Sequence, residues 1–230
     1  MAETDSGIEK LAYCEVIVVR HGETEWNASG KIQGHLDVEL NEVGREQAAL
    51  VGDRVSREFK VSAVYSSDLK RALVTAETIA DRCGLSEVFK DPDLRERNLG
   101  DIQGLTIREA ATVRTKAYQA FKSHSTSQEI PGGGESLDQL YQRCTSSLQR
   151  IAKKHIGQCV VVVSHGGAIR ALYNRASPNR MFGGKVLNTS INIFHISGED
   201  EWTIKSWGDV SHLNQAWYLE SGFGGDRLSG

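Results

Sequence analysis

The sequence contains two related stretches, Val16-Ile17-Val18-Val19-Arg20-His21-Gly22 and, much later, Val160-Val161-Val162-Val163-Ser164-His165-Gly166. In both, four β-branched residues in a row precede a polar residue, a histidine and a glycine. Such runs are typical of strands that are buried on both faces of a parallel sheet. Because open α/β sheets bind their ligands beyond the carboxyl ends of the strands, we expect His21 and His165 to lie together at one ligand-binding edge.

The segments between these stretches have the spacing of helices. Helices are expected after Asn41, from Ser67 or Asp68 to Gly84, from Thr106 to about Phe121, and from Ser136 to Gly157. Further strands are expected at Val61–Tyr65 and as a pair, Ile191–Phe194 and Trp202–Ile204, around the turn Gly198-Glu199-Asp200. Strands that alternate with helices predict a single-domain, three-layer α/β/α fold with a mostly parallel, doubly wound sheet.

The composition gives no sign of a second domain. We expect a polar N-terminal extension at residues 1–13, a folded domain at residues 14–220 and a flexible glycine-rich tail at residues 221–230, which frays or folds over the pocket as a lid. The extension has neither the apolar core of a signal peptide nor the arginine-rich character of a transit peptide, which favours a cytoplasmic location. The 4 cysteines form no C-x-x-C pair and no metal-ligand spacing, which excludes a disulfide-rich scaffold.

The overall charge argues against two classes of partner. The 230 residues include 27 Lys and Arg and 30 Asp and Glu, for a net charge of −3. A nucleic-acid-binding protein would need a broad basic surface, and the longest apolar runs are too short to cross a bilayer. We therefore expect neither nucleic acid nor a membrane as a partner.

Positive charge is nevertheless concentrated at the predicted edge of the sheet. Arg20 directly precedes His21, and Arg71 lies one turn into the helix that follows the third strand. A guanidinium is a planar fork suited to phosphate. Its charge also lowers the pKa of a nearby imidazole, which favours the neutral form that can attack phosphorus. Transfer of a phosphoryl group also needs an acid for the leaving oxygen, and Glu96 is the best candidate.

These residues lie in motifs that occur in a fixed order: Arg20-His21-Gly22-Glu23-Thr24 with Asn27, Leu40-Asn41-x-x-Gly44, Ser66-Ser67-Asp68-Leu69-x-Arg71-Ala72-x-x-Thr75-Ala76, Leu94-Arg95-Glu96, Gly133-Gly134-Glu135-Ser136 and Ser164-His165-Gly166-Gly167. An Arg-His-Gly triplet alone is weakly specific, whereas several motifs in order are strongly specific. Over roughly residues 14 to 195, the chain resembles the histidine phosphatase superfamily, the phosphoglycerate-mutase-like enzymes.

The resemblance implies a metal-independent reaction that passes through a phosphohistidine, with phosphoryl charge stabilised by arginines and histidines rather than by a metal or another cofactor. The implied catalytic residues are His21 as the nucleophile, Glu96 as acid and then base, and three residues that hold the phosphoryl oxygens, with Asn27, and stabilise the transition state: Arg20, Arg71 and His165.

Several other residues have both a functional and a structural interpretation. Gly166 can offer its backbone N–H to a ligand, and Gln33 either contacts the phosphate or is an ordinary polar loop residue. For Glu23 and for Glu135-Ser136 we expect structural roles, in a loop and at the start of a helix. Three histidines are expected to be solvated: His35, His124 and His155.

Hydrolysis of a small phosphomonoester, a sugar phosphate or related metabolite, is the predicted reaction. The segment between Glu96 and Glu135 is short and has no Arg-Arg pair, which resembles the phosphatase branch of the family. Conversely, a mutase is resembled by the stretch Glu96-Arg97-Asn98-Leu99-Gly100. In that alternative, Arg97 binds a substrate carboxylate and the cofactor is 2,3-bisphosphoglycerate. A third alternative is an inactive phosphate-binding scaffold, although both the nucleophile and the acid are present.

Overall fold

A computed structural model describes residues 12–177 and 185–213, which contain one six-stranded sheet in the order β3-β2-β4-β1-β5-β6. The strands are β1 (Tyr13–Arg20), β2 (Val61–Ser66), β3 (Val88–Lys90), β4 (Cys159–Ser164), β5 (Ile191–Ser197) and β6 (Trp202–Asp209). The first four strands in that order are parallel, while β5 and β6 are antiparallel to their neighbours. The prediction of a mostly parallel sheet, with the late strand pair at one edge, is therefore confirmed.

The two valine-rich runs are direct neighbours in the sheet. β1 and β4 pair in register, with Val16 opposite Val160 and Val19 opposite Val163. The His21 backbone N–H then donates to the Ser164 carbonyl at 3.0 Å, one residue before His165. Because both strands end at the same point, both histidines emerge at the same edge of the sheet, as the sequence predicts.

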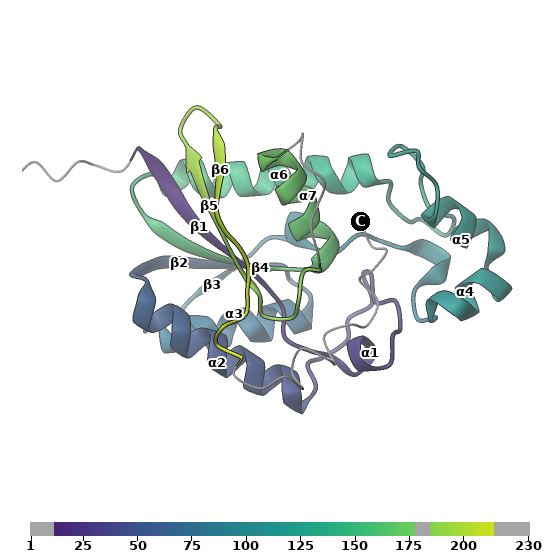
Figure 1. The fold of residues 1–230 in the computed structure, drawn as a ribbon, viewed down its shortest axis with the longest axis horizontal. Helices are drawn as coiled ribbons and strands as arrows, with labels where there is room; N and C mark the ends of the chain where they lie inside the picture. The colour runs from purple at the N-terminus through teal and green to yellow at the C-terminus, as the bar shows by residue number, and fades with distance from the viewer. Residues whose placement is uncertain (1–11, 178–184, 214–230) are drawn as a thin grey trace, which may run out of the picture.

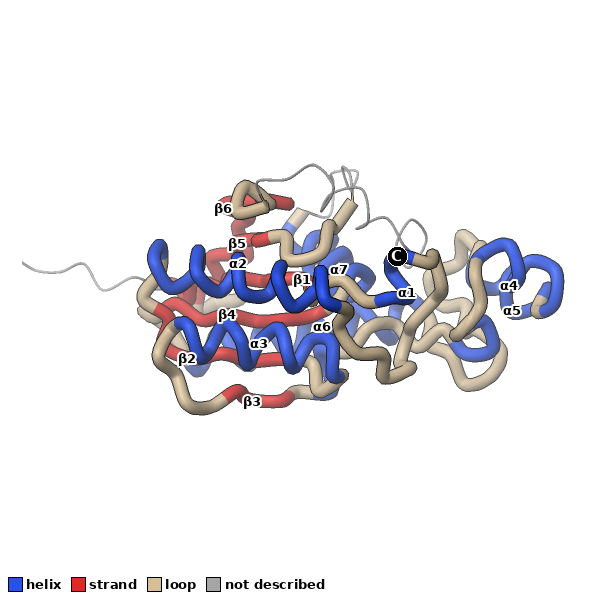
Figure 2. The backbone as a smooth tube through the Cα atoms, turned by 90° about the horizontal axis from the view of Figure 1, so that it is seen from below, coloured by secondary structure: helices blue, strands red, loops and turns tan. Residues whose placement is uncertain are grey.

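Helices cover both faces of the sheet (Figures 1 and 2), which confirms the three-layer prediction. In chain order the helices are α1 (Glu25–Ala28), α2 (Glu42–Glu58), α3 (Lys70–Arg82), α4 (Ile107–Val113), α5 (Thr115–Phe121), α6 (Leu137–Lys154) and α7 (Gly166–Ala176), with 3₁₀ turns at Pro92–Leu94 and Gly100–Ile102. α2 and α3 lie on one face, and α6 and α7 on the other.

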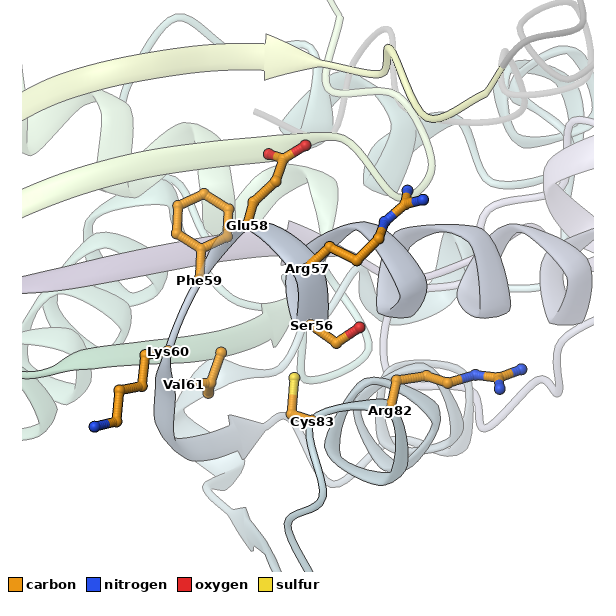
Figure 3. Close-up of a pocket in the computed structure, with 8 residues that line it drawn as sticks. All are labelled: Ser56, Arg57, Glu58, Phe59, Lys60, Val61, Arg82 and Cys83. Atoms are coloured by element: carbon orange, nitrogen blue, oxygen red, sulfur yellow. The ribbon is translucent and has the colours of Figure 1, made fainter.

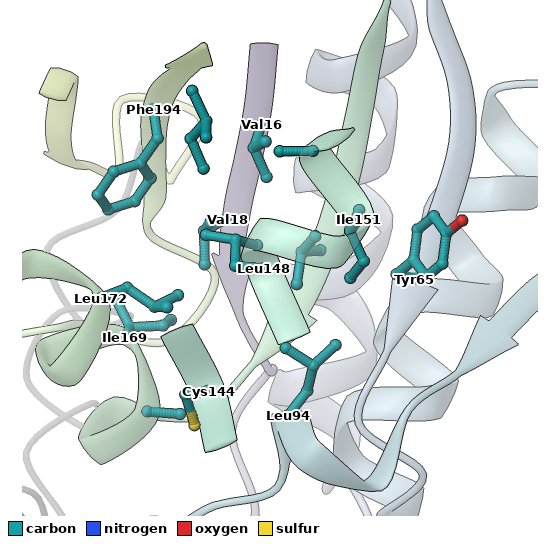
Figure 4. Close-up of a cluster of buried hydrophobic side chains, with 14 of the residues drawn as sticks. Val16, Val18, Tyr65, Leu94, Cys144, Leu148, Ile151, Ile169, Leu172 and Phe194 are labelled. Atoms are coloured by element: carbon teal, nitrogen blue, oxygen red, sulfur yellow. The ribbon is translucent and has the colours of Figure 1, made fainter. Parts of the chain in front are cut away.

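Successive residues of the central strands supply two separate cores. Val16 and Val18 of β1 pack with α6 and α7 against residues such as Leu148 (Figure 4), while Ile17 and Val19 pack with α2 and α3 on the opposite face. Each of these strand residues is fully buried. This two-sided burial explains why the runs are apolar without alternation.

A third apolar cluster lies at one end of the molecule, where both views show α4 and α5 beyond the carboxyl end of β1 (Figures 1 and 2). The predicted continuous helix from Thr106 to Phe121 is wrong in one respect. It begins with the expected capping box between Thr106 and Glu109, but its backbone breaks at Arg114 (φ −132°, ψ 48°). The break allows Ala110 and Phe121 to reach the same cluster from two short helices.

The start of α3 also differs from the prediction. The residue before the helix is Leu69, whose side chain makes no capping bond. Ser67 and Asp68 are used elsewhere, since the Ser67 hydroxyl contacts the His165 ring and Asp68 pairs with Arg95. The predicted caps Asn41 and Ser136 are confirmed, as is Gly84 in a left-handed conformation after α3. The predicted glycine-rich tail lies outside the described residues, as does the N-terminal extension up to residue 11.

Two glycines allow the loop after β1 to lie directly on the start of α2. A Cβ on Gly22 would come within 2.3 Å of the Gly44 carbonyl oxygen, and a Cβ on Gly44 within 2.0 Å of the Glu23 carbonyl oxygen. The Gly22 N–H also donates to the Thr75 hydroxyl of α3 at 3.1 Å. The backbone beside His21 is thus fixed by both helices of this face.

We predict that Gly44→Ala destabilises the protein by about 1–3 kcal/mol, because the new methyl group overlaps backbone that cannot move aside. Helix propensity alone predicts the opposite sign, since alanine is better than glycine inside a helix by about 1 kcal/mol. Urea denaturation measures the difference. The control is Gly198→Ala, where no atom lies within 4 Å and the expected change is within about 0.5 kcal/mol. A stabilised Gly44→Ala protein would contradict this account.

Candidate active site

His21 is held with one defined ring nitrogen available for chemistry. Its side chain is buried, and its Nδ1 lies 2.6 Å from the Gly22 carbonyl oxygen. A carbonyl oxygen can only accept, so Nδ1 carries the proton of the neutral ring. The lone pair of that tautomer is therefore on Nε2, which makes Nε2 the nucleophilic atom.

The surroundings keep His21 neutral. Burial, followed by the charges of Arg71 and Arg20, holds the pKa of His21 well below its ordinary value. Desolvation disfavours the imidazolium, and two neighbouring cations disfavour it further. The ring is therefore in its nucleophilic form at neutral pH.

His165 lies beside His21 at the start of α7, with ring centroids 5.1 Å apart. Its Nε2 lies 2.9 Å from the Ser67 hydroxyl, while its buried Nδ1 has no hydrogen-bond partner within residues 12–177 and 185–213. Burial, and then the charge of Arg71, lowers the pKa of His165 well below its ordinary value. A second neutral imidazole thus lies beside the first.

Backbone carbonyls hold the two arginines. Arg20 donates from Nη1 to the Val186 carbonyl at 2.7 Å. Arg71 donates from Nη1 to the Leu36 carbonyl at 2.9 Å and from Nη2 to the Gly34 carbonyl at 2.8 Å. Both side chains are 1% exposed. These carbonyls fix the guanidinium planes, and the positive charge of the two arginines at this edge of the sheet favours an anion.

The carboxylate of Glu96 is fixed at the start of α7, next to His165. One oxygen accepts from the Arg97 N–H at 2.8 Å, and the other from the Gly167 N–H of the first turn of α7 at 3.0 Å. Both donors are backbone groups, and Glu96 is 5% exposed. The structure therefore assembles all five residues predicted as catalytic: Arg20, His21, Arg71, Glu96 and His165.

The remaining predicted residues surround these five. Asn27 is buried and accepts from the Thr24 N–H at 3.1 Å, in the capping box of α1. Gln33 is 9% exposed, and its buried Oε1 has no hydrogen-bond partner among the described residues. Arg97 is buried and donates from Nε to the Glu135 carbonyl at 3.0 Å. Gly166 is buried and begins α7.

Some residues at the site were not expected from the sequence. The Asn188 amide donates to the His21 carbonyl at 2.9 Å, and Thr189, with a φ of +53°, donates its N–H to the Arg20 carbonyl at 3.0 Å. A non-glycine residue at such a φ is uncommon and marks a tightly determined backbone. Nothing in the sequence around residues 186–190 links this segment to the histidine motifs, because the contact depends on tertiary folding.

Two of the three histidines expected to be solvated are not. The His35 ring lies 2.7 Å from the Glu96 carbonyl oxygen, and the His155 ring lies 2.9 Å from the Tyr65 hydroxyl. Only His124 is exposed as predicted. Glu135 also does more than precede a helix, since both its carboxylate oxygens pair with Arg143 of α6, at 2.6 and 2.8 Å.

A separate hollow of about 440 Å³ lies at the amino-terminal end of β2, away from these residues. Its basic side chains Arg57, Lys60 and Arg82 do not converge on a common point (Figure 3), and Arg82 pairs with Asp53 at 3.2 Å. Within the described residues there is no cluster of three or more His, Cys, Asp or Glu side chains that could hold a metal ion. None of the described helices is long and apolar enough to span a membrane.

Comparisons with known proteins agree with this geometry. The model of the histidine phosphatase superfamily (branch 1) matches residues 16–210. The chain is 59% identical over 230 residues to phosphoglycerate mutase-like protein 4 of Arabidopsis thaliana, covering 100% of both chains. It is 50% identical over 212 residues to a metal-independent phosphoserine phosphatase of Arabidopsis thaliana, covering 92% of this chain and 88% of the relative. A solved phosphoserine phosphatase from Entamoeba histolytica, in complex with 3-phosphoglyceric acid, is similar with a TM-score of 0.72 and 30% identity, covering 87% of this chain and 99% of that one.

We predict that stability falls as the pH decreases below about 6.5. Burial is the main cause that lowers the pKa of four histidines, His21, His35, His165 and His212, the last to about 4. The unfolded chain then binds more protons than the folded one, so each such histidine costs up to about 1.4 kcal/mol per pH unit on acidification.

Urea denaturation between about pH 7.5 and about pH 5 measures this slope. His212→Gln keeps a polar group near the Thr189 hydroxyl. It should reduce the dependence of the unfolding free energy on pH by the contribution of one histidine, up to about 1.4 kcal/mol per pH unit. A stability that stays constant over this range would show that these histidines are not held neutral.

Proposed function

Since the chain belongs to the histidine phosphatase superfamily, we propose that it hydrolyses a small phosphomonoester that carries a carboxylate, with His21 as the nucleophile. The observation that carries this proposal is the His21 ring, whose Nδ1 is bound to the Gly22 carbonyl while Arg20 and Arg71 flank it. Such a ring presents a neutral Nε2 at an anion-binding point. A scaffold that only bound phosphate would not need a nucleophile in this state.

In the first step, Nε2 of His21 attacks phosphorus and the bond between phosphorus and the leaving oxygen breaks. Glu96 supplies the proton that the leaving alkoxide takes up, so the products are an alcohol and a phosphohistidine. Arg20 and Arg71 hold the phosphoryl oxygens, whose negative charge is spread over all three in the transition state. Both guanidinium groups are fixed before substrate arrives, so little reorganisation is required.

In the second step, water attacks the phosphorus of the phosphohistidine and gives its proton to Glu96. The bond between phosphorus and Nε2 breaks, inorganic phosphate leaves, and both His21 and Glu96 return to their starting states. One carboxylate therefore serves as acid and then as base. The backbone N–H groups of Arg97 and Gly167 hold this carboxylate in place while it gives up and regains the proton.

His165 acts as a neutral hydrogen-bond donor in this mechanism. The Ser67 hydroxyl, which accepts from the Leu69 N–H at 3.3 Å, can also donate its own proton, and we assign that proton to the bond with Nε2 of His165. The ring proton is then on Nδ1, the nitrogen that has no partner within the described residues. A phosphoryl oxygen is the partner that this buried N–H fits.

Arg97 supports the choice of a substrate with a carboxylate. Its buried guanidinium is fixed through Nε to the Glu135 carbonyl, and it follows Glu96 directly. Burial lowers the pKa of Arg97, but an arginine stays charged at neutral pH. Phosphoserine and 3-phosphoglycerate, the compounds named with the relatives, both have a carboxylate close to the phosphorylated oxygen. Gln33 and Asn27 complete the proposed binding site, with the Gly166 N–H.

The second candidate function is a mutase, because one relative carries the name phosphoglycerate mutase-like protein 4. It differs from hydrolysis in the acceptor, which would be a phosphoglycerate rather than water, and in its need for 2,3-bisphosphoglycerate.

A cytoplasmic location is also proposed. The cysteines Cys14, Cys83, Cys144 and Cys159 are free thiols, which suits a reducing compartment.

We predict phosphate release from phosphoserine in the presence of a metal chelator and without 2,3-bisphosphoglycerate. The assay compares phosphoserine, 3-phosphoglycerate and sugar phosphates with and without the bisphosphate. His21→Ala should lower turnover by at least about 10³-fold, because it removes the proposed nucleophile, whereas turnover by His124→Ala, at an exposed position, should be unchanged. Isomerisation that depends on the bisphosphate would instead establish the mutase.

We further predict that Arg97→Leu discriminates between substrates. It should raise KM for phosphoserine by about 10–100-fold, because a charged hydrogen bond of about 1.5–3 kcal/mol is lost. The KM for a phosphate ester without a carboxylate should change by less than about 3-fold. Equal losses on both substrates would show that Arg97 has only a structural role.

A further inference from the structure

His35 lies between the two parts of the site that handle the phosphate and the proton. The carbonyl groups on either side of it, those of Gly34 and Leu36, accept from Arg71 at 2.8 and 2.9 Å. The His35 ring reaches the Glu96 carbonyl oxygen, with Nε2 at 2.7 Å. The segment 34–36 thus binds Arg71 through two backbone carbonyls and Glu96 through the His35 side chain.

The state of the His35 ring follows from its partners. The Glu96 carbonyl can only accept, so Nε2 of His35 carries a proton and donates. Burial, the largest influence, lowers the pKa of His35, which is therefore neutral at pH 7. The His35 backbone is fixed as well, since its N–H donates to Oε1 of Gln103 at 2.7 Å, and the same oxygen accepts from the Leu99 N–H at 3.2 Å.

The Glu96 carbonyl receives a second donor from another direction. Nη2 of Arg143, on α6, donates to it at 2.7 Å, and Nη1 donates to the Arg95 carbonyl at 2.7 Å. Glu135 pairs with Arg143 and accepts from the Asn98 N–H at 2.7 Å. Arg143 therefore fixes the Glu96 loop to α6, whereas His35 alone among these donors connects that loop to the backbone that holds Arg71.

We propose that His35 is a positioning residue that sets Glu96 relative to the phosphoryl group held by Arg71. This inference rests on the proposed function, in which Glu96 transfers the proton. General acid catalysis requires the acid within hydrogen-bond reach of the leaving oxygen, and a displacement of about 1 Å in an active site can cost about 10²-fold in rate. Without His35, the phosphate would still bind and Nε2 of His21 would still attack, but the proton would arrive at the wrong place.

The test compares substrates whose leaving groups differ in their need for a proton. One is phosphoserine, or the alkyl phosphate that the wild-type protein hydrolyses fastest. The other is p-nitrophenyl phosphate, whose leaving group departs without a proton at neutral pH. The variants are His35→Leu, which removes the donor, and His35→Gln, whose amide Nε2 can donate to the same carbonyl. His124→Leu, at an exposed position, is the matched control.

For His35→Leu we expect kcat on the alkyl phosphate to fall by about 10–100-fold, while KM changes by less than about 3-fold. The rate of the first-turnover burst of p-nitrophenolate should change by less than about 3-fold, because that step needs no acid. His35→Gln should recover at least about a third of the wild-type kcat, and the control should match the wild type. Thermal unfolding of each variant identifies losses that come from instability.

Glu96→Gln separates this inference from the proposed function. The comparison uses the first turnover, because Glu96 is also the base for the second step on both substrates. If Glu96 is the acid, Glu96→Gln slows the first turnover of the alkyl phosphate and leaves the burst of p-nitrophenolate nearly unchanged, and adding His35→Leu to it causes little further loss. A Glu96→Gln protein that slows both first turnovers equally would overturn the proposed function itself. A selective Glu96→Gln with a folded His35→Leu that slows neither first turnover, or slows both equally, would overturn the role of His35 alone.

Discussion

The in-register pairing of β1 with β4 is the constraint on which the site depends. Because Val19 lies opposite Val163, the two strands end at the same edge of the sheet. The histidines that follow them, far apart in sequence, therefore lie side by side, with ring centroids 5.1 Å apart. A shift of this register by one residue would turn one histidine to the opposite face of the sheet. A hydrogen bond just beyond the strand ends holds this register, since the His21 N–H donates to the Ser164 carbonyl at 3.0 Å, and the Ser67 N–H holds β4 against β2 in the same way by donating to the Val163 carbonyl at 3.0 Å.

The charge at this edge shows why the net charge of the chain is a poor guide to its ligand. The total of −3 describes the whole molecule, whereas a phosphate bound as proposed meets the buried guanidinium groups of Arg20 and Arg71. Carbonyl groups at 2.7 to 2.9 Å orient both of them. After burial, which is the larger influence, these cations lower the pKa of His21, and in the proposed mechanism they also bind the anion that His21 attacks. Part of the activation of the proposed nucleophile therefore has the same physical origin as the proposed binding of phosphate.

Much of this site was predictable from the sequence, because its residues follow strands or open helices at fixed positions in motifs. The runs Val16–Val19 and Val160–Val163 indicated the central strands, and the Arg-His-Gly and Ser-His-Gly triplets indicated the edge. The prediction did not include α7, whose first turn begins with Gly166 and Gly167, residues of low helix propensity. It is the tertiary packing of Ile169 and Leu172 against the sheet that stabilises this helix.

The residues that the sequence did not reveal are those that act through backbone contacts across the fold. His35, Asn188 and Arg143 each donate to a carbonyl group of a site residue or its loop. A carbonyl group is present at every position, so no residue type in the partner segment indicates such a contact in advance. These contacts determine where Glu96 and His21 lie, and a three-dimensional structure is required to find them.

The most direct test of the central claim is to trap the covalent intermediate. Substrate carrying a ³²P label is mixed with the protein, the reaction is quenched in alkali within one turnover, and the labelled peptide and the phosphorylated ring nitrogen are identified. We expect acid-labile phosphate on Nε2 of His21, because Nδ1 is bound to the Gly22 carbonyl. Label on another residue or on Nδ1, or turnover without any labelled protein, would contradict it.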